Sequence, residues 1–548
     1  MKQLHTVITD LSVTSCASPG VPVACPLEKR TWNRLEKDLY LHAGEQAAWI
    51  YLEERDTADV VNGNRVITDI WVGATKPPGD GEDGWEQRSC GIWILRSHYT
   101  DHYLRLLTGI DVLFGTDAVD PRPGWTLLPA PLQLEDQPDV PAPRLSARFG
   151  PPIPRPDDPN APLRVNKDGK FKIVQISDTH MVTGAGVCND AIDANGQPLP
   201  SIEADPNTIK FIGEILDVEK PDLVILSGDQ VHHDIPDTQS PLFKVVSPLI
   251  SRSIPFAMVF GNHDDEGTYA LSRMSRSTFS VQFSVLTLVD VGGKQMAILQ
   301  DLPFCLAQAG PDSVDGVGNY YLQLFSSDEK QVPLATIFFF DSHGQITSDD
   351  KNPDYEPIQQ SQIDWFTSTS RHLKKTRIAK RDASSPFLSL AFMHIPFPEY
   401  AGDDLSISGG KRREPTEGPS INTHLYDALV QEEVSAVGCG HDHVNDFCAL
   451  LPKLQRGHLV ERNDQSVKHG PWLCYNGGSG FGGYCSYDEN RYYRRTRVWE
   501  IDANKGDLKT WKRIEYSGNR FEEVVLVEGG RTTAPSTMLE TEKTCRIL

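Results

Sequence analysis

The chain has 548 residues, too many for one ordinary compact domain, and its 39% hydrophobic content is sufficient for a sizeable core. Its 75 acidic residues outnumber 53 basic ones, and the net charge of −22 argues against general nucleic-acid binding, which needs clustered Lys and Arg. The first residues lack an apolar signal-peptide core and no apolar run is long enough to span a bilayer, so we expect a cytoplasmic protein in which most of the ten cysteines stay reduced.

The amino-terminal part predicts strands. Residues 1–118 contain segments in which apolar and polar positions alternate, separated by Gly and Asp turns, and they predict a β-rich domain. Thirteen of the 39 prolines fall in the next stretch, residues 119–165. Because proline fixes φ and lacks an N–H donor, we expect a linker there without regular strand or helix.

After residue 165 the pattern changes to short apolar runs that alternate with helix-like stretches, such as 206–219 with Asp205 as its N-cap. This alternation predicts an α/β domain over residues 166–515, with buried sheets and helices outside. Late strands are expected at 497–501 and 508–513, and residues 516–548 are expected to form a flexible tail.

Five polar segments in this domain each follow an apolar run of strand length. They are Asp178–His180, Gly228–Asp229, Gly261–Asp264, Met393–His394 and Gly440–His443. Because sites in α/β folds form at the carboxyl ends of strands, these segments are expected to converge.

The residue types in these segments are those of a metal site. Aspartate supplies anionic oxygen that can bridge two cations, imidazole supplies nitrogen suited to Zn, Fe or Mn, and asparagine supplies neutral oxygen. Each motif alone is weak, since Asp-x-His occurs in surface loops and a single Met-His occurs at many strand ends. The complete ordered set, each member at a strand exit, favours a metal centre.

In this order the motifs resemble those of the calcineurin-like metallophosphoesterase superfamily, over roughly residues 170–485. The β-rich region ahead of them and the glycine-rich segment Asn476–Tyr484, called the glycine run below, resemble fungal dose-dependent cell-cycle regulator phosphatases and related plant purple-acid-phosphatase-like proteins. The resemblance implies a four-layer αββα sandwich with an N-terminal β-rich domain.

The resemblance also implies residue roles. One metal ion would be held by Asp178, His180, Asp229 and His443, and the second by Asp229, Asn262, His394 and His441. Asn262 and His263 would contact the phosphate, and His263, oriented by Asp264, would protonate the leaving oxygen. Two divalent or trivalent ions, of Fe, Zn or Mn, would clamp the phosphoryl group and supply hydroxide at neutral pH.

These roles predict hydrolysis of phosphomonoesters, with either a small molecule or a phosphoprotein as the substrate. Two alternatives stay open: a phosphodiesterase, and a non-catalytic scaffold with the same fold. Purple acid phosphatases carry a metal-binding tyrosine three residues after the bridging aspartate, where this chain has His232, so no tyrosinate is expected.

Other segments leave two interpretations each. His232 and His233 form either an exposed loop pair or a substrate contact, and the glycine run either offers amides to a phosphate or packs tightly over the site. Residues 341–344 follow an apolar run and are candidates to border the pocket, whereas 411–413 form either a solvated basic face or an anion-recognition element. The terminal segment from Cys545 fits a prenylation box that would allow membrane association; the alternative is an unmodified tail.

Overall fold

The computed structural model describes the chain except residues 1–5, 18–31, 42–45, 78–83, 100–104, 136–139, 201, 234, 265–290, 329–331, 347–352, 381–386, 452–453, 456–457, 460–469 and 536–548. The prenylation motif at Cys545 lies outside the described residues. Two compact units divide the chain. The first comprises Met1–Pro156, Thr183–Ala185 and Pro236–Ser247; the second comprises Asp157–Val182, Gly186–Ile235 and Pro248–Leu548.

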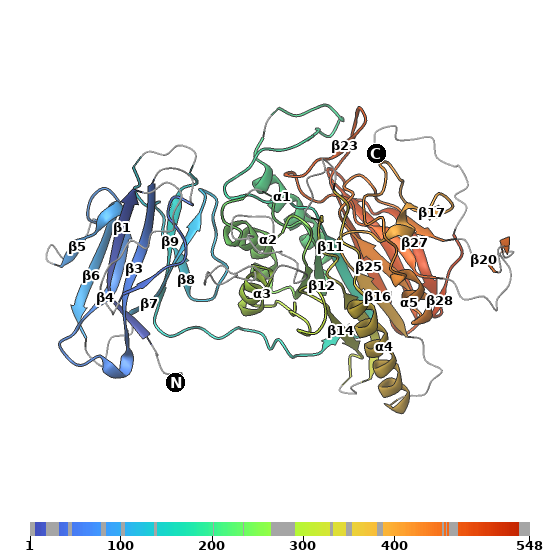
Figure 1. Cartoon of the computed structure of the whole chain (residues 1–548), viewed down its shortest axis with the longest axis horizontal. Coiled ribbons are helices and arrows are strands. Elements are labelled where there is room, and N and C mark those ends of the chain that lie inside the picture. The colour runs from blue at the N-terminus through green and yellow to red at the C-terminus, as the bar shows by residue number, and fades with distance from the viewer. Residues whose placement is uncertain are drawn as a thin grey trace, which may run out of the picture. The chain divides into compact units, whose positions relative to one another are not determined.

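The first unit is β-rich, as the alternating pattern predicted (Figure 1). Among its described residues there are three sheets, each of three antiparallel strands in the orders β1-β3-β2, β4-β6-β5 and β7-β9-β8. Their core contains Ile50, Ile94, Val112 and Leu145. The strands are β1 (Thr6–Ala17), β2 (Trp32–Arg34), β3 (Gln46–Asp56), β4 (Arg65–Val72), β5 (Trp85–Gln87), β6 (Ile92–His98), β7 (Leu107–Phe114), β8 (Trp125–Leu127) and β9 (Pro143–Phe149).

Our prediction that the proline-rich stretch 119–165 contains no strand was wrong. Strand β9 lies between β7 and β8, and only its first residue, Pro143, lacks an N–H. The other residues of β9 donate normally, because the prolines lie between the strands and not inside them.

The second unit contains two large mixed sheets. In its described part, the eight-stranded sheet has the order β10-β14-β15-β16-β18-β22-β19-β17 and the seven-stranded sheet the order β13-β12-β11-β25-β26-β27-β28. The central strands β12 and β16 are buried along their whole length, which explains their continuous apolar runs.

The eight-stranded sheet consists of β10 (Leu163–Arg164), β14 (Tyr320–Phe325), β15 (Pro333–Phe339), β16 (Leu388–Phe392), β17 (Ser406–Ser408), β18 (Ala436–Cys439), β19 (Cys448–Leu450) and β22 (Trp472–Tyr475). The seven-stranded sheet consists of β11 (Lys170–Ile176), β12 (Leu223–Ser227), β13 (Phe256–Val259), β25 (Arg495–Asp502), β26 (Asp507–Ile514), β27 (Phe521–Glu528) and β28 (Arg531–Thr532). Short hairpins pair β20 (Leu454–Gln455) with β21 (His458–Leu459), and β23 (Ser486–Tyr487) with β24 (Asn490–Arg491).

The two sheets face each other and exchange buried hydrogen bonds. Gln175 of β11 donates from Nε2 to the Cys439 carbonyl of β18 at 3.1 Å, and its Oε1 accepts from Trp499 Nε1. Helices α1 (Ala204–Glu219), α2 (Gln239–Ser251) and α3 (Val291–Asp301) connect strands of the seven-stranded sheet or follow it, and α4 (Gln360–Lys380) and α5 (Leu425–Gln431) connect strands of the other (Figure 1). Mixed sheets with helices between their strands, and a β-rich unit earlier in the chain, agree with the α/β architecture predicted from the sequence.

Helices on both outer faces bury apolar residues. Ile212 and Leu216 of α1 are buried, and Glu219 at its end accepts hydrogen bonds from Trp511 and Arg513 of β26. On the other sheet, α4 and α5 contribute Phe366 and Leu429 to one core with strand residues. Helix α1 begins two residues earlier than predicted. Asp205 does not cap the helix, and its carboxylate accepts the Val182 N–H instead.

The prediction that a flexible tail begins at residue 516 was wrong. Strand β27 pairs with β26, and β28 pairs with β27, so the described sheet continues to Thr532. Val524 and Leu526 of β27 are buried, and this burial holds the segment on the sheet. Within the described ranges no helix is long and apolar enough to cross a membrane.

Two buried features cross-link the second unit. Cys448 of β19 and Cys474 of β22 lie opposite each other and form a disulfide, a pair that our expectation of mostly reduced cysteines did not identify. Asp446 forms ion pairs with three basic side chains, those of Arg413, Arg495 and Lys512. Although burial disfavours its charge, these cations hold the pKa of Asp446 well below its usual range.

Candidate metal centre

The five predicted segments follow the carboxyl ends of five strands. Asp178 and His180 follow β11, Asp229 follows β12, and Asn262 follows β13, all in the seven-stranded sheet. His394 follows β16, and His441 and His443 follow β18, in the eight-stranded sheet. Because the ligand-type residues come from both sheets, the site depends on the packing of one sheet against the other.

The backbone at the site adopts an uncommon conformation. Four residues have positive φ, between 46° and 75°, where residues other than glycine are rare: Asp178, His180, Asp229 and His441. Such strain collects at functional sites when the surrounding structure enforces it. Here the four residues follow three of the five strands, β11, β12 and β18.

Six side chains form two groups with metal-ligand geometry. The first cluster is Asp178, His180 and His443, and the second cluster is Asp229, His394 and His441; within each, the potential ligand atoms lie within 4.8 Å of one another. Within its own cluster, Asp229 Oδ2 lies 3.1 Å from His394 Nε2. The same oxygen lies 3.8 Å from His180 Nε2 of the first cluster. The Asp229 carboxylate is therefore placed to serve both clusters.

The electrostatics of the site favour a cation. Burial, reinforced by the nearby Asp229 carboxylate, raises the pKa of Asp178 to about 7. Burial and neighbouring imidazoles hold the pKa of His180 and of His441 well below the usual range, so both rings are neutral and keep a lone pair for a ligand bond. The Asp229 carboxylate, with Asp178, raises the pKa of His394 to about 10 despite its burial, so a cation there would take the place of a proton. Buried carboxylates among imidazoles are the donor set that Zn, Fe or Mn would use.

Unsatisfied polar atoms point to the same conclusion. Asp178 Oδ2, Asn262 Oδ1 and His441 Nε2 are buried and have no hydrogen-bond partner among the residues that the structure describes. Buried polar atoms in proteins almost always have partners. Bound cations would satisfy all three atoms, so these residues fit a pair of metal ions.

The two residues predicted to be catalytic lie beside the second cluster. The His263 ring is 29% exposed, and its Nε2 lies 4.0 Å from Asp229 Oδ2. Asp264, in contrast, is buried and accepts backbone N–H groups from three residues: Gln230, Val231 and Gly261. Both of its oxygens hold the loops that carry Asp229 and Asn262, which differs from the predicted role of orienting His263.

The glycine run packs directly against the first cluster. The Ser479 and Gly480 amides donate to the Ser177 and Asp178 carbonyls, and Gly478 donates to the His443 carbonyl at 2.7 Å. An added Cβ at Gly480 would lie 2.1 Å from the Thr179 carbonyl oxygen. These amides are engaged with protein carbonyls, so the observed contacts favour the packing interpretation over phosphate binding.

His232 and His233 are half-buried, so the exposed-loop interpretation is wrong. The His232 ring centroid lies 5.4 Å from that of His180, and the His233 centroid lies 5.0 Å from that of His263. Both rings therefore border the metal centre.

The remaining candidates have structural partners. His343 Nε2 and Gln362 Oε1 lie 2.8 Å apart in a buried hydrogen bond. Of the basic run, Arg412 donates to the Tyr400 and Gly402 carbonyls, and Arg413 pairs with Asp446. These interactions favour a structural role over anion recognition.

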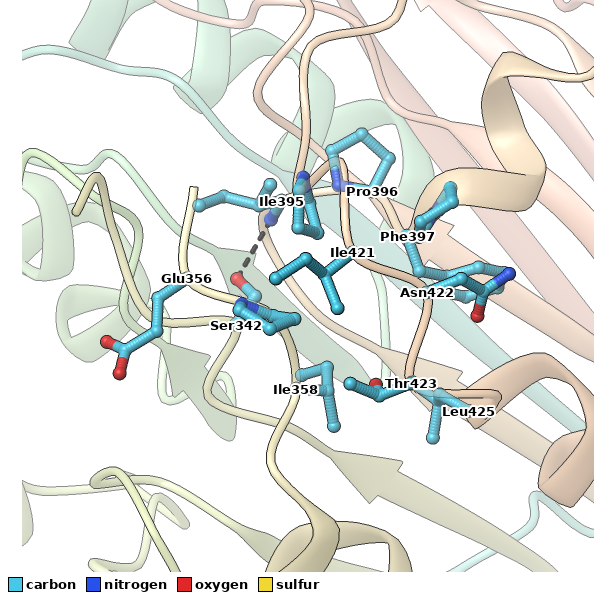
Figure 2. A pocket seen from close by; sticks show the side chains of 13 residues that line it. Ser342, Glu356, Ile358, Ile395, Pro396, Phe397, Ile421, Asn422, Thr423 and Leu425 are labelled. Carbon is cyan, nitrogen blue, oxygen red and sulfur yellow. Dashed lines mark hydrogen bonds between the residues drawn. The ribbon is translucent and has the colours of Figure 1, made fainter. Parts of the chain in front are cut away.

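A small hollow lies beside the segment that follows His394 (Figure 2). Ser342 accepts the Ile395 N–H at its wall, where Pro396 and Phe397 supply apolar surface. Its volume of about 10 Å³ is room for a single water molecule, so it is too small for a substrate group. Residues 341–344 thus border this hollow through Ser342.

Two tyrosines at the site carried no recognisable sequence signal. Tyr355 stands edge-on to the His441 ring, with centroids 5.0 Å apart. Tyr484 stacks on the His443 ring at 3.9 Å, and its carbonyl oxygen lies 2.8 Å from His443 Nδ1. Neither tyrosine belongs to a strand-exit motif, and only the position of Tyr484 as the last residue of the glycine run could have suggested it.

Comparisons with known proteins agree with this geometry. A family model described as calcineurin-like phosphoesterase matches residues 171–445. Phosphatase DCR2 of Saccharomyces cerevisiae is 34% identical over 75% of this chain and 65% of its own length, so the match spans less than two thirds of that relative. Probable inactive purple acid phosphatase 29 of Arabidopsis thaliana is 31% identical over 64% of this chain and 84% of its own. Among solved structures, purple acid phosphatase PPD1 from yellow lupin aligns with 94% of this chain and 96% of its own at 11% identity and a TM-score of 0.37.

Proposed function

Because this chain belongs to the calcineurin-like phosphoesterase family, as its motifs predicted, we propose that it is a metal-dependent phosphatase that hydrolyses phosphomonoesters. The observation that carries the proposal is the position of Asp229, whose carboxylate reaches both clusters of buried ligand-type side chains. Its substrate would be a phosphorylated small molecule or a phosphoprotein. The acidic chain makes nucleic acid an unfavourable partner.

The proposed ligands divide into two sets that share Asp229. The first metal ion would be held by Asp178, His180, Asp229 and His443, and the second by Asp229, Asn262, His394 and His441. A pair of ions at these positions would polarise the phosphoryl group and lower the pKa of a water molecule. Their identity as Fe, Zn or Mn stays open to measurement.

Side chains next to the metal ligands would then position the phosphate and protonate the leaving oxygen. Asn262 presents a buried amide oxygen that has no partner among the described residues, and the adjacent His263 ring is 29% exposed, whereas the imidazoles of the two clusters are buried. His263 can therefore reach a leaving oxygen and donate a proton to it. Asp264 supports this step indirectly, by holding the backbone of the Asp229 loop.

One experiment distinguishes a phosphomonoesterase from two other functions. A phosphodiesterase would use the same ligands, and a non-catalytic scaffold is a reasonable alternative because some relatives are named probable inactive phosphatases. Purified, metal-loaded protein should hydrolyse p-nitrophenyl phosphate faster than bis(p-nitrophenyl) phosphate, and elemental analysis should find two metal ions per chain. Faster turnover of the diester would favour the phosphodiesterase, and full metal occupancy without hydrolysis of either ester would favour the scaffold.

The compartment is a separate question. A cytoplasmic location was expected from the sequence, but the buried Cys448–Cys474 disulfide favours an oxidising compartment, because disulfides are rare where thiols are kept reduced. We therefore propose that the protein matures in an oxidising environment.

A further inference from the structure

The two nitrogens of the His180 ring have different surroundings. Its Nε2 lies 3.1 Å from His443 Nε2, inside the first cluster. Its Nδ1 lies 3.3 Å from His232 Nδ1, in hydrogen-bond contact on the opposite side of the ring. The His232 ring meets it edge-on, with an interplanar angle of 76°.

This geometry determines which atom donates. A neutral imidazole has one N–H and one lone pair, and a cation in the first cluster would take the lone pair at His180 Nε2. His180 Nδ1 then carries the hydrogen and donates it, so His232 Nδ1 is the acceptor. The hydrogen of a neutral His232 is consequently on Nε2.

The backbone holds His232 in this position. Its N–H donates to the Met181 carbonyl at 2.9 Å, and the Met181 N–H donates to the Gln230 carbonyl at 3.0 Å. Met181 and Val231 form a parallel bridge between the two strand exits. His232 is therefore fixed to the residue that directly follows His180 and does not depend on a loose loop.

Two other imidazoles of the site, those of His443 and His394, show the same arrangement with different acceptors. His443 Nδ1 lies 2.8 Å from the Tyr484 carbonyl oxygen, and His394 Nδ1 lies 2.9 Å from the Ser227 carbonyl oxygen. Each of these contacts leaves Nε2 to face the cluster. Such partners orient a ligating imidazole and raise its basicity.

We propose that His232 is a positioning residue that accepts the Nδ1 hydrogen of His180 and thereby sets the affinity of the first cluster for its metal ion. This deepens the proposed function and rests on it. It also replaces the substrate contact first considered for His232, because the nitrogen that faces the site is engaged with His180 and not with a phosphate.

The test measures Zn²⁺ binding by the full-length protein, without substrate. Metal-free protein is loaded with Zn²⁺ alone, and retained zinc is measured against increasing chelator concentration. His232→Ala should release one of the two ions at about 10- to 100-fold lower chelator concentration, as for other partners of ligating histidines. His233→Ala is the matched control, since its ring is 4.1 Å from that of His232 and equally half-buried, and it should behave as wild type.

Two further variants separate the hydrogen bond from packing. His232→Asn puts an amide oxygen where Nδ1 stood and should retain zinc nearly as wild type does, whereas His232→Phe keeps the ring without an acceptor and should fail as alanine does. Melting curves of the metal-free proteins identify any variant that has lost its fold.

The outcomes are distinguishable from failure of the proposed function. Wild-type protein that retains neither Zn²⁺ nor, in the same assay, Mn²⁺ or Fe overturns both proposals. If wild type binds two ions and His232→Ala binds zinc with unchanged affinity, only the proposed role of His232 is overturned. If that variant also has a raised KM, His232 contacts the substrate instead. Equal losses in the asparagine and phenylalanine variants would also overturn the inference.

Discussion

Replacing Gly480 with alanine would test how tightly the glycine run holds the first cluster. The new Cβ would lie 2.1 Å from the Thr179 carbonyl oxygen, whereas ordinary contact begins at 3.4 Å, so the segment between Asp178 and His180 must move by about 1.3 Å. The atoms in the way are backbone and cannot rotate aside. Because displacement by about 1 Å costs on the order of 100-fold in rate, we expect a loss of at least this size in kcat/KM.

The assay compares Gly480→Ala with Gly518→Ala, where the added Cβ meets nothing within 4 Å. Both proteins are measured for kcat/KM on p-nitrophenyl phosphate and for retained zinc. The Gly480 variant should lose activity together with zinc affinity. Overpacking should also lower its free energy of unfolding by about 1–3 kcal/mol. If it matches the Gly518 variant in rate and zinc content, the argument that this contact positions the ligands is refuted.

Three further predictions concern other parts of the second unit. Asp229→Asn should lose bound metal, whereas His263→Ala should keep it and lose about 10²- to 10⁴-fold in turnover; equal metal loss in elemental analysis would refute the separate roles. Peptide mapping without reductant should recover Cys448 linked to Cys474, and replacing both by serine should cost about 2–4 kcal/mol of unfolding free energy in urea; quantitative alkylation of the native protein at both thiols would contradict the linkage. Asp446→Asn should cost about 3–5 kcal/mol, because it leaves buried cations without their partner. Since the folded pKa of Asp446 is lowered, this difference from wild type should be full above the ordinary value of 3.8 and shrink as pH falls below it, and urea titrations that show a difference growing toward low pH would contradict the ion pairing.

The strand-exit motifs were predictable because each is local. An apolar run followed by Asp178 or His394 reports a buried strand and its polar end within a few residues of sequence. The flanking regions were harder to interpret. The prolines of 119–165 suggested a linker, but they lie between short strands, and the strand at 521–528 was missed because its burial depends on β26 beside it.

Roles that depend on hydrogen-bond partners could not be predicted. Asp264 follows His263 in sequence, which suggested a direct pairing, yet its oxygens accept three backbone amides. His232 looked like a loop residue, yet a backbone bridge fixes it beside His180. In both residues the partner is set by how two strand exits meet.

The sequence by itself determined the family and the ligand-type residues at the strand ends, because motif order and strand-end position are properties of the chain. Only the tertiary structure decided that four of the ligand-type residues adopt left-handed backbone and that the amides of the glycine run bind protein carbonyls. The physical reason is that the site draws its ligands from two different sheets, and the distance between them is set by the packing of those sheets.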